Sequence, residues 1–232
     1  WMADQALRLT GRRPDVVVVS HYHGDHSAGL PGFGVDESAP EVWLTGATRN
    51  RLTEGLREAA PERADPMARA LERAVARPDD EDDTLDLGGR RVRIGARRGH
   101  TASDVTVELD APPVVFCGDL VWNDMFPNYV DARPSQLRRA VASIAIGPDS
   151  VLVPGHGPLA DADAFGRYVA VLDAVEAHAR EARRVGRTAA EAAADVELPS
   201  ASTHWTSFSP SYFERALGAW LTELEGEDSW TH

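Results

Sequence analysis

The pattern of hydrophobic and polar positions changes near residue 157. Before that point, apolar runs of strand length alternate with helical patterns, and Gly, Pro or Asp residues separate them. The run 16–19, four consecutive valines, predicts a strand that is buried on both faces. Further strands are predicted at 41–44, 90–94, 105–109, 114–117 and 150–153, and helices at 48–60, 65–77 and from Ser135 to near Gly147.

Beyond Gly157 the pattern is helical throughout. Apolar residues recur there at helical spacing, namely Phe165, Tyr168, Leu172 and Val175. An alanine-rich helix is expected at 189–194, and a last amphipathic helix begins near Ser209. We therefore expect a mixed α/β domain over residues 1–160 and a helical extension over residues 161–232 that packs on the same domain.

Charge and cysteine content narrow the class of protein. The 37 acidic residues outnumber the 24 basic ones, and the net charge of -13 disfavours nucleic acid and anionic membranes as partners. The single Cys117 excludes an internal disulfide and a metal site built from cysteines. With no membrane-length apolar run and no signal-peptide pattern, we expect a soluble, cytoplasmic protein, although the start at Trp1 leaves open what precedes it.

A dense group of potential metal ligands follows the valine strand directly. The segment His21-Tyr22-His23-Gly24-Asp25-His26 places four potential ligands in six positions. In an extended segment, residues two apart point the same way, so His21 and His23 can share one metal. Gly24 permits a sharp turn that would let Asp25 and His26 address a second metal.

Three later segments each place a ligand where a strand ends. They are Gly99-His100-Thr101, Cys117-Gly118-Asp119 and Pro154-Gly155-His156-Gly157. The flanking glycines let the backbone crowd a metal centre. Five of the eight histidines fall in the segment 21–26 or in these three later segments. This placement favours a metal centre over a histidine-rich surface turn.

The order of these motifs resembles that of the metallo-β-lactamase superfamily, whose signature H-x-H-x-D-H precedes a distant His, Asp and His. The similarity covers residues 21–157. It implies a four-layer αββα sandwich with metals at one edge of the sheets, here lacking part of the N-terminal sheet because few residues precede the first motif. The implied ligands are His21, His23 and His100 for the first metal, Asp25, His26 and His156 for the second, and Asp119 bridging both.

The resemblance also narrows the branch of the family. True β-lactamases generally lack the bridging aspartate, so Asp119 favours glyoxalase II, lactonase or phosphodiesterase relatives. Trp122 stands where quorum-quenching lactonases typically have tyrosine, which argues against a strict lactonase. Substrate contact is left open for three residues of the loop after Asp119, namely Asn123, Asn128 and Tyr129. We expect packing roles for the C-terminal aromatic residues Trp205, Phe208, Tyr212 and Phe213. We expect no ligand role for His178, His204 and His232.

The expected function is hydrolysis of an ester, thioester or lactone in a small-molecule substrate. Two divalent ions, zinc with iron or manganese as alternatives, would convert water to metal-bound hydroxide at neutral pH. Asp25 is the candidate catalytic residue, receiving the last proton of that hydroxide. The alternatives are a persulfide dioxygenase with one iron, and a phosphodiesterase or ribonuclease, which the acidic balance disfavours. The acyl group and the oligomeric state are not encoded in any motif.

Overall fold

The computed structural model describes residues 1–36 and 38–228. Their contacts divide the chain into two compact units, Trp1–Asp83 and Thr84–His232. Each unit is built on one sheet, three-stranded in the first and five-stranded in the second. In the described part of the chain, no helix combines the length and apolarity needed to cross a membrane.

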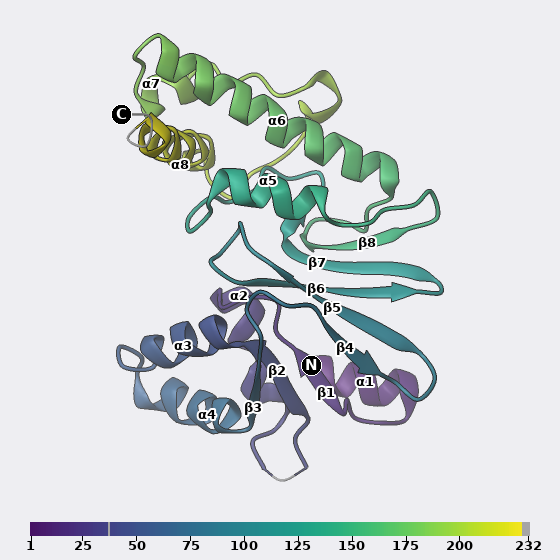
Figure 1. The fold of residues 1–232 in the computed structure, drawn as a ribbon. Helices are drawn as coiled ribbons and strands as arrows, with labels where there is room; N and C mark the ends of the chain where they lie inside the picture. Colours follow the sequence, from purple (N-terminus) through teal and green to yellow (C-terminus); the bar gives the residue numbers. More distant parts are fainter. Residues whose placement is uncertain (37, 229–232) are drawn as a thin grey trace. The chain divides into compact units, whose positions relative to one another are not determined.

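The first unit carries a small parallel sheet with the strand order β1-β2-β3 (Figure 1). Its elements are α1 (Met2–Thr10), β1 (Val16–Val18), α2 (Gly24–Ser27), the 3₁₀ helix η1 (Leu30–Phe33), β2 (Glu41–Thr45), α3 (Gly46–Gly55), α4 (Pro61–Glu72) and β3 (Ala74–Arg77). The valine strand β1 is only half-buried, because it lies at the edge of the sheet, so the prediction of burial on both faces was wrong. Leu44 and Leu71 lie in the core of this unit.

Element boundaries in the first unit differ from the predicted ones for identifiable reasons. The α3 helix begins early because the Thr45 hydroxyl caps it, accepting a hydrogen bond from the Thr48 amide at 3.2 Å. The α4 helix begins at Pro61, which suits a first helical position, and ends at Glu72. The last predicted helical turn is instead β3, because pairing with β2 overrides local helix propensity. Helix α1 was not predicted.

The second unit holds a five-stranded sheet in the order β4-β5-β6-β7-β8. The strands are β4 (Asp83–Asp86), β5 (Arg91–Arg97), β6 (Asp104–Asp110), β7 (Pro113–Trp122) and β8 (Val151–His156). The pairs β5–β6 and β6–β7 are antiparallel, whereas β7 and β8 run parallel. All four strands predicted in this region are confirmed, and β7 is longer than predicted because it continues past register shifts to Trp122.

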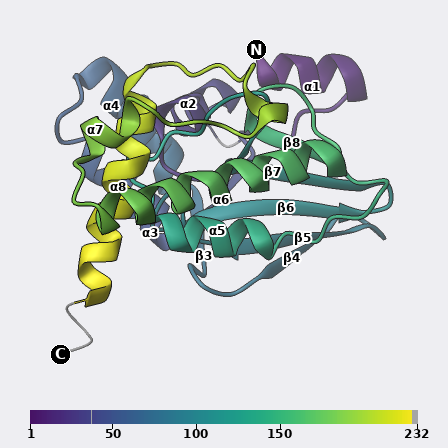
Figure 2. The ribbon, with the colours of Figure 1, turned by 90° about the horizontal axis from the view of Figure 1, so that it is seen from above.

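Four helices and one 3₁₀ turn follow or interrupt the strands of the second unit. They are α5 (Pro134–Ala142), α6 (Ala162–Arg184), α7 (Ala189–Ala193), η2 (Ser200–Ser202) and α8 (Ser211–Asp228). Figure 2 shows α5 and α6 running along the sheet, and both contact β7. The predicted apolar face of α6 is confirmed, since Tyr168, Leu172 and Val175 are buried. Arg133, and not Ser135, immediately precedes α5.

Candidate metal centre

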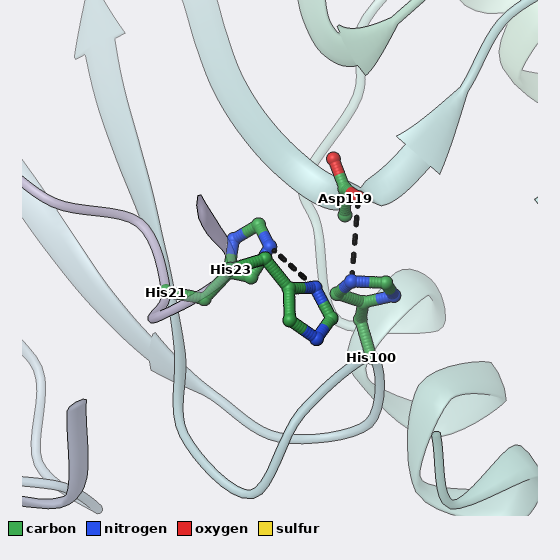
Figure 3. A group of neighbouring side chains, drawn as sticks. All are labelled: His21, His23, His100 and Asp119. Atoms are coloured by element: carbon green, nitrogen blue, oxygen red, sulfur yellow. Dashed lines mark hydrogen bonds and ion pairs between the residues drawn. The ribbon is translucent and has the colours of Figure 1, made fainter. Parts of the chain in front are cut away.

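The first unit presents its donors on the turn that joins β1 to α2. His21 is buried, and its Nε2 atom lies 3.1 Å from Nδ1 of His23 (Figure 3). The His26 ring is 4.4 Å from the His21 ring, measured between centroids. The rings of His21 and His23 therefore lie close together in the folded unit, as the sharing of one metal ion would require.

The second pair of donors in this turn comes from the short helix α2. The Asp25 carboxylate lies 3.6 Å from Nε2 of His26, and the Asp25 side chain is 58% exposed. The helix begins with His23 as its N-cap, and a Cβ added at Gly24 would meet nothing within 4 Å among the described residues. The turn needs no special glycine conformation at position 24, so the predicted role of Gly24 was wrong. The start of a helix makes the turn instead.

Two serines hold this ligand turn. The buried Ser27 hydroxyl lies within hydrogen-bonding distance of two carbonyls, that of Tyr22 at 3.0 Å and that of His23 at 2.9 Å, and can donate its proton to either. The Ser20 hydroxyl lies 3.1 Å from Nδ1 of His21, on the ring edge opposite the atom that faces His23. A hydrogen bond at one ring nitrogen selects the tautomer and leaves the other nitrogen available to a metal.

The second unit places one carboxylate between two imidazoles. Asp119 is only 5% exposed. One of its oxygens, Oδ2, lies 3.3 Å from Nε2 of His100 (Figure 3), and the other, Oδ1, lies 3.5 Å from Nε2 of His156. Each oxygen thus faces a different histidine. These three donors come from the β5–β6 turn, from β7 and from the end of β8.

Glycines make this close approach possible. A Cβ at Gly155 would overlap the Asp119 carboxylate and lie 2.8 Å from the Gly118 carbonyl atoms. Gly157, at φ 93°, has no room for a Cβ against the Asn123 backbone. Gly99, at φ 151°, has none against the Leu137 backbone. Only glycine fits at these positions, so these flanking glycines allow the close backbone contacts that hold His100, Asp119 and His156.

The turn that carries His100 is held by Asp104, a residue that the sequence analysis missed. Its carboxylate accepts hydrogen bonds from the His100 amide at 3.1 Å and from the Thr101 hydroxyl at 2.8 Å, as well as from the Thr101 amide. Burial raises the pKa of Asp104 to about 7. The signal was present in the spacing, because an aspartate side chain commonly forms hydrogen bonds with backbone groups three or four residues earlier in the chain, here those of Thr101 and His100.

Aromatic side chains surround His156. The Trp122 ring lies 4.2 Å from it and the Phe208 ring 5.4 Å, both between centroids. Phe208 is 63% exposed, so the prediction that it is a packing residue was wrong, whereas Trp205 and Tyr212 are buried as predicted. The Asn123 amide donates to the carbonyls of Pro158 and Leu159, each at 3.2 Å, and so holds the loop after His156.

Cys117 and the histidines outside the ligand motifs make contacts of other kinds. Burial raises the pKa of Cys117 to about 12, so it remains an inert thiol. His178 lies 2.9 Å from the Ala192 carbonyl, and His204 faces Asp124 at 3.5 Å. Neither belongs to a candidate metal-binding group among the described residues, and His232 lies outside them.

The chemistry of the donors fits divalent metal ions. Imidazole nitrogens and carboxylate oxygens are the ligands that zinc, manganese and iron accept in proteins. A buried carboxylate is stable only when cations or hydrogen-bond donors surround it. Asp119, with one oxygen toward His100 and one toward His156, meets this requirement once metal ions are bound.

Comparisons with known proteins agree with this arrangement. The family model "Metallo-beta-lactamase superfamily" matches residues 2–156. A hydroxyacylglutathione hydrolase of Acidiphilium cryptum is 29% identical over 211 residues, which are 86% of this chain and 78% of that protein. One from Albidiferax ferrireducens is 24% identical over 152 residues, which are 64% of this chain and 51% of that protein. This chain thus spans only about half the length of the second relative.

Solved structures show the same fold. A beta-lactamase domain protein from Burkholderia ambifaria superposes with a TM-score of 0.60 at 19% identity, covering 97% of this chain and 73% of that one. A metallo-beta-lactamase from Pontibacter korlensis gives a TM-score of 0.56 at 21% identity, covering 74% and 75%. The predicted fold class is confirmed. The chain belongs to the metallo-β-lactamase superfamily and is a hydrolase of that fold.

Proposed function

We propose that the chain hydrolyses a thioester, ester or lactone of a small molecule with two zinc ions. The first ion would be held by His21, His23 and His100, the second by Asp25, His26 and His156, and Asp119 would bridge them. The observation that carries this proposal is the Asp119 carboxylate, which directs one oxygen toward His100 and the other toward His156. A carboxylate whose two oxygens face two different histidines is suited to bridge two metal ions, one beside each histidine.

The donor set is suited to hydrolysis. Divalent ions, when bound, lower the pKa of a coordinated water toward about 7 and so make hydroxide available at neutral pH. Asp25 is well placed to hold a proton in transfer, because its half-exposed carboxylate keeps access to solvent beside His26. The exposed Phe208 ring presents aromatic surface beside His156, where an acyl chain can exclude water, and the buried Trp122 ring packs against His156.

Thioesters are the leading substrate class. The curated relatives that match this chain are hydroxyacylglutathione hydrolases, and the similarity to one of them extends over most of this chain. The bridging position of Asp119 is the feature of the resemblance that separates this branch from the true β-lactamases. We therefore place thioesters first, esters and lactones second, and β-lactams last among the expected substrates.

Metal analysis combined with a substrate panel tests the proposal. The purified protein should contain two zinc ions per chain and hydrolyse thioesters faster than lactones, phosphodiesters or β-lactams. Chelation should abolish the activity, and added zinc should restore it. One iron per chain together with oxygen consumption would instead identify an oxygenase and overturn the proposal, as would a preference for phosphodiesters.

The role of Asp25 is tested by Asp25→Asn, with Asp15→Asn as control. Asp15 is an exposed acid of the same unit and lies just before β1. Asp25→Asn should lower kcat by about 10² to 10⁴, the usual range for loss of a proton acceptor, and weaken the binding of one metal ion. Asp15→Asn should leave both unchanged. Full activity and full metal content in Asp25→Asn would exclude the proposed role.

A further inference from the structure

A groove in the first unit begins at the ligand turn itself. It encloses about 700 Å³. Tyr22 and Gly24 of the ligand turn line part of it, and the Tyr22 ring lies 4.8 Å from the ring of the donor His23, measured between centroids. The rest of the lining comes from Ser27 and Ala28 at the end of α2, from α3 and α4, and from the segment that joins those two helices, and we call this cavity the α3–α4 groove.

Three arginines line the α3–α4 groove, in a chain whose net charge is -13. Arg51 lies 5.1 Å from the centre of the Tyr22 ring and 3.4 Å from the Glu54 carboxylate. In contrast, Arg57 and Arg63 have no side-chain hydrogen bond or ion pair to any residue that the structure describes. Both guanidinium groups therefore keep their donors available for an anion.

The floor of the α3–α4 groove is apolar. Met67 is buried there, and Leu52 and Leu56 are half-buried. Two glutamates, Glu54 and Glu58, also line the groove, but the arginines exceed them by one charge. An apolar floor with cationic groups above it suits a molecule that has a hydrocarbon segment and an anionic end.

We propose that the α3–α4 groove binds the part of the substrate remote from the bond that is cleaved, and that this part carries a carboxylate or a phosphate. Arg57 and Arg63 bind the anion, while Met67, Leu52 and Leu56 contact the adjoining carbon chain. The inference deepens the proposed function, on which it rests, by naming anionic thioesters as the preferred substrates. Tyr22 lines the groove, and its ring lies 4.8 Å from the ring of His23, measured between centroids, so a substrate held at His23 can extend past Tyr22 into the groove.

The double variant Arg57→Gln/Arg63→Gln tests this proposal, with Arg49→Gln/Arg69→Gln as the matched control. Arg49 lies on α3 and Arg69 on α4, the two helices that border the groove, but neither arginine lines it. Succinyl and butyryl thioesters of one neutral thiol compare substrates of equal carbon length with and without a carboxylate. A butyryl thioester of a phosphate-bearing thiol places the anion on the leaving group and so distinguishes the two sources of charge.

The expected result is a change in KM for anionic substrates alone. In the Arg57→Gln/Arg63→Gln protein, KM for at least one anionic thioester should rise about tenfold or more, the size of one lost charge-assisted contact, with kcat unchanged. The neutral butyryl thioester and the control variant should show no change. The substrate whose KM rises identifies the side that carries the anion.

Other outcomes separate the groove from the hydrolase activity. If the double variant leaves KM unchanged from the wild-type value for each of the three substrates, the groove proposal is overturned, while the proposed hydrolase activity stands. If no thioester is cleaved, the proposed function fails, and binding of a non-cleavable succinyl thioether by calorimetry then decides the groove on its own. Binding that the double variant weakens tenfold supports the groove, and binding that the variant leaves unchanged overturns it.

Discussion

The two compact units assemble their donors in contrasting ways. The first unit supplies four donors from one six-residue turn, with α2 starting inside the turn. The second unit supplies three donors, and the first of them precedes the last by more than fifty residues along the chain. The first arrangement is therefore local, whereas the second depends on strand pairing and on glycines that admit close backbone contact.

This contrast predicts where each unit is vulnerable. In the first unit, side-chain replacements in the ligand turn should remove individual donors and leave the scaffold intact. In the second unit, changes at supporting positions such as Gly155 or Asp104 should displace donors that they do not replace. The predictions below compare the two units at matched positions, beginning with the largest expected effect.

Replacement of the shared carboxylate should have the largest effect. Asp119→Asn keeps the shape of the side chain but removes the charge that faces both His100 and His156. We expect kcat/KM to fall by about 10³-fold or more and both metal ions to be lost. In Asp25→Asn, by comparison, the binding of only one metal ion should be weakened. Metal content by mass spectrometry and steady-state kinetics measure these effects. Retention of two tightly bound metals in Asp119→Asn would refute the bridging role.

A pair of glycine substitutions compares the scaffolds directly. Gly155→Ala forces a Cβ into the Asp119 carboxylate and the Gly118 backbone, so we expect a loss of about 3 kcal/mol in the free energy of unfolding. Gly24→Ala meets no described atom within 4 Å and should change stability by less than about 0.5 kcal/mol. Urea unfolding of the metal-free proteins measures both values. Equal destabilisation by the two variants would remove the proposed contrast.

The residues that orient the donors should have intermediate effects. Asp104→Asn weakens the acceptor that fixes the His100 turn, and we expect metal affinity to fall about 10- to 100-fold. Ser20→Ala removes the contact to Nδ1 of His21, but His23 also contacts the His21 ring, so the loss should be smaller. Competition with a zinc-binding dye measures both affinities. A larger loss in Ser20→Ala than in Asp104→Asn would contradict this ranking.

The smallest effect is expected at Cys117, the only cysteine of the chain and a probe of the second unit alone. Burial disfavours the thiolate and raises the pKa to about 12, so the thiol stays protonated at neutral pH. Alkylation of the native protein should be slow, and its rate should show no plateau near the ordinary thiol pKa of about 8.5. Intact-mass measurement follows the modification. Rapid alkylation with a plateau near that pH would show that the second unit opens readily.

Elements set by local sequence signals were predicted correctly, whereas features set by contacts between distant residues were not. The strands β6 and β8 were predicted because their apolar runs and bounding residues are local signals. The segment that forms β3 was predicted as helix, since its alanines favour helix until pairing with β2 outweighs them. Phe208 was taken for a packing residue because no local pattern shows that its ring lies exposed beside His156.

The amino-acid sequence by itself determined the family, the seven candidate ligands and the local ligand turn of the first unit, because these depend on residue type and short spacing. Only the tertiary structure decided that Asp119 lies between His100 and His156, that Asp104 holds the His100 turn, and that the α3–α4 groove begins at the ligand turn. The physical reason is that these arrangements depend on strand pairing, close backbone packing and the placement of neighbouring helices, which join residues far apart in the chain.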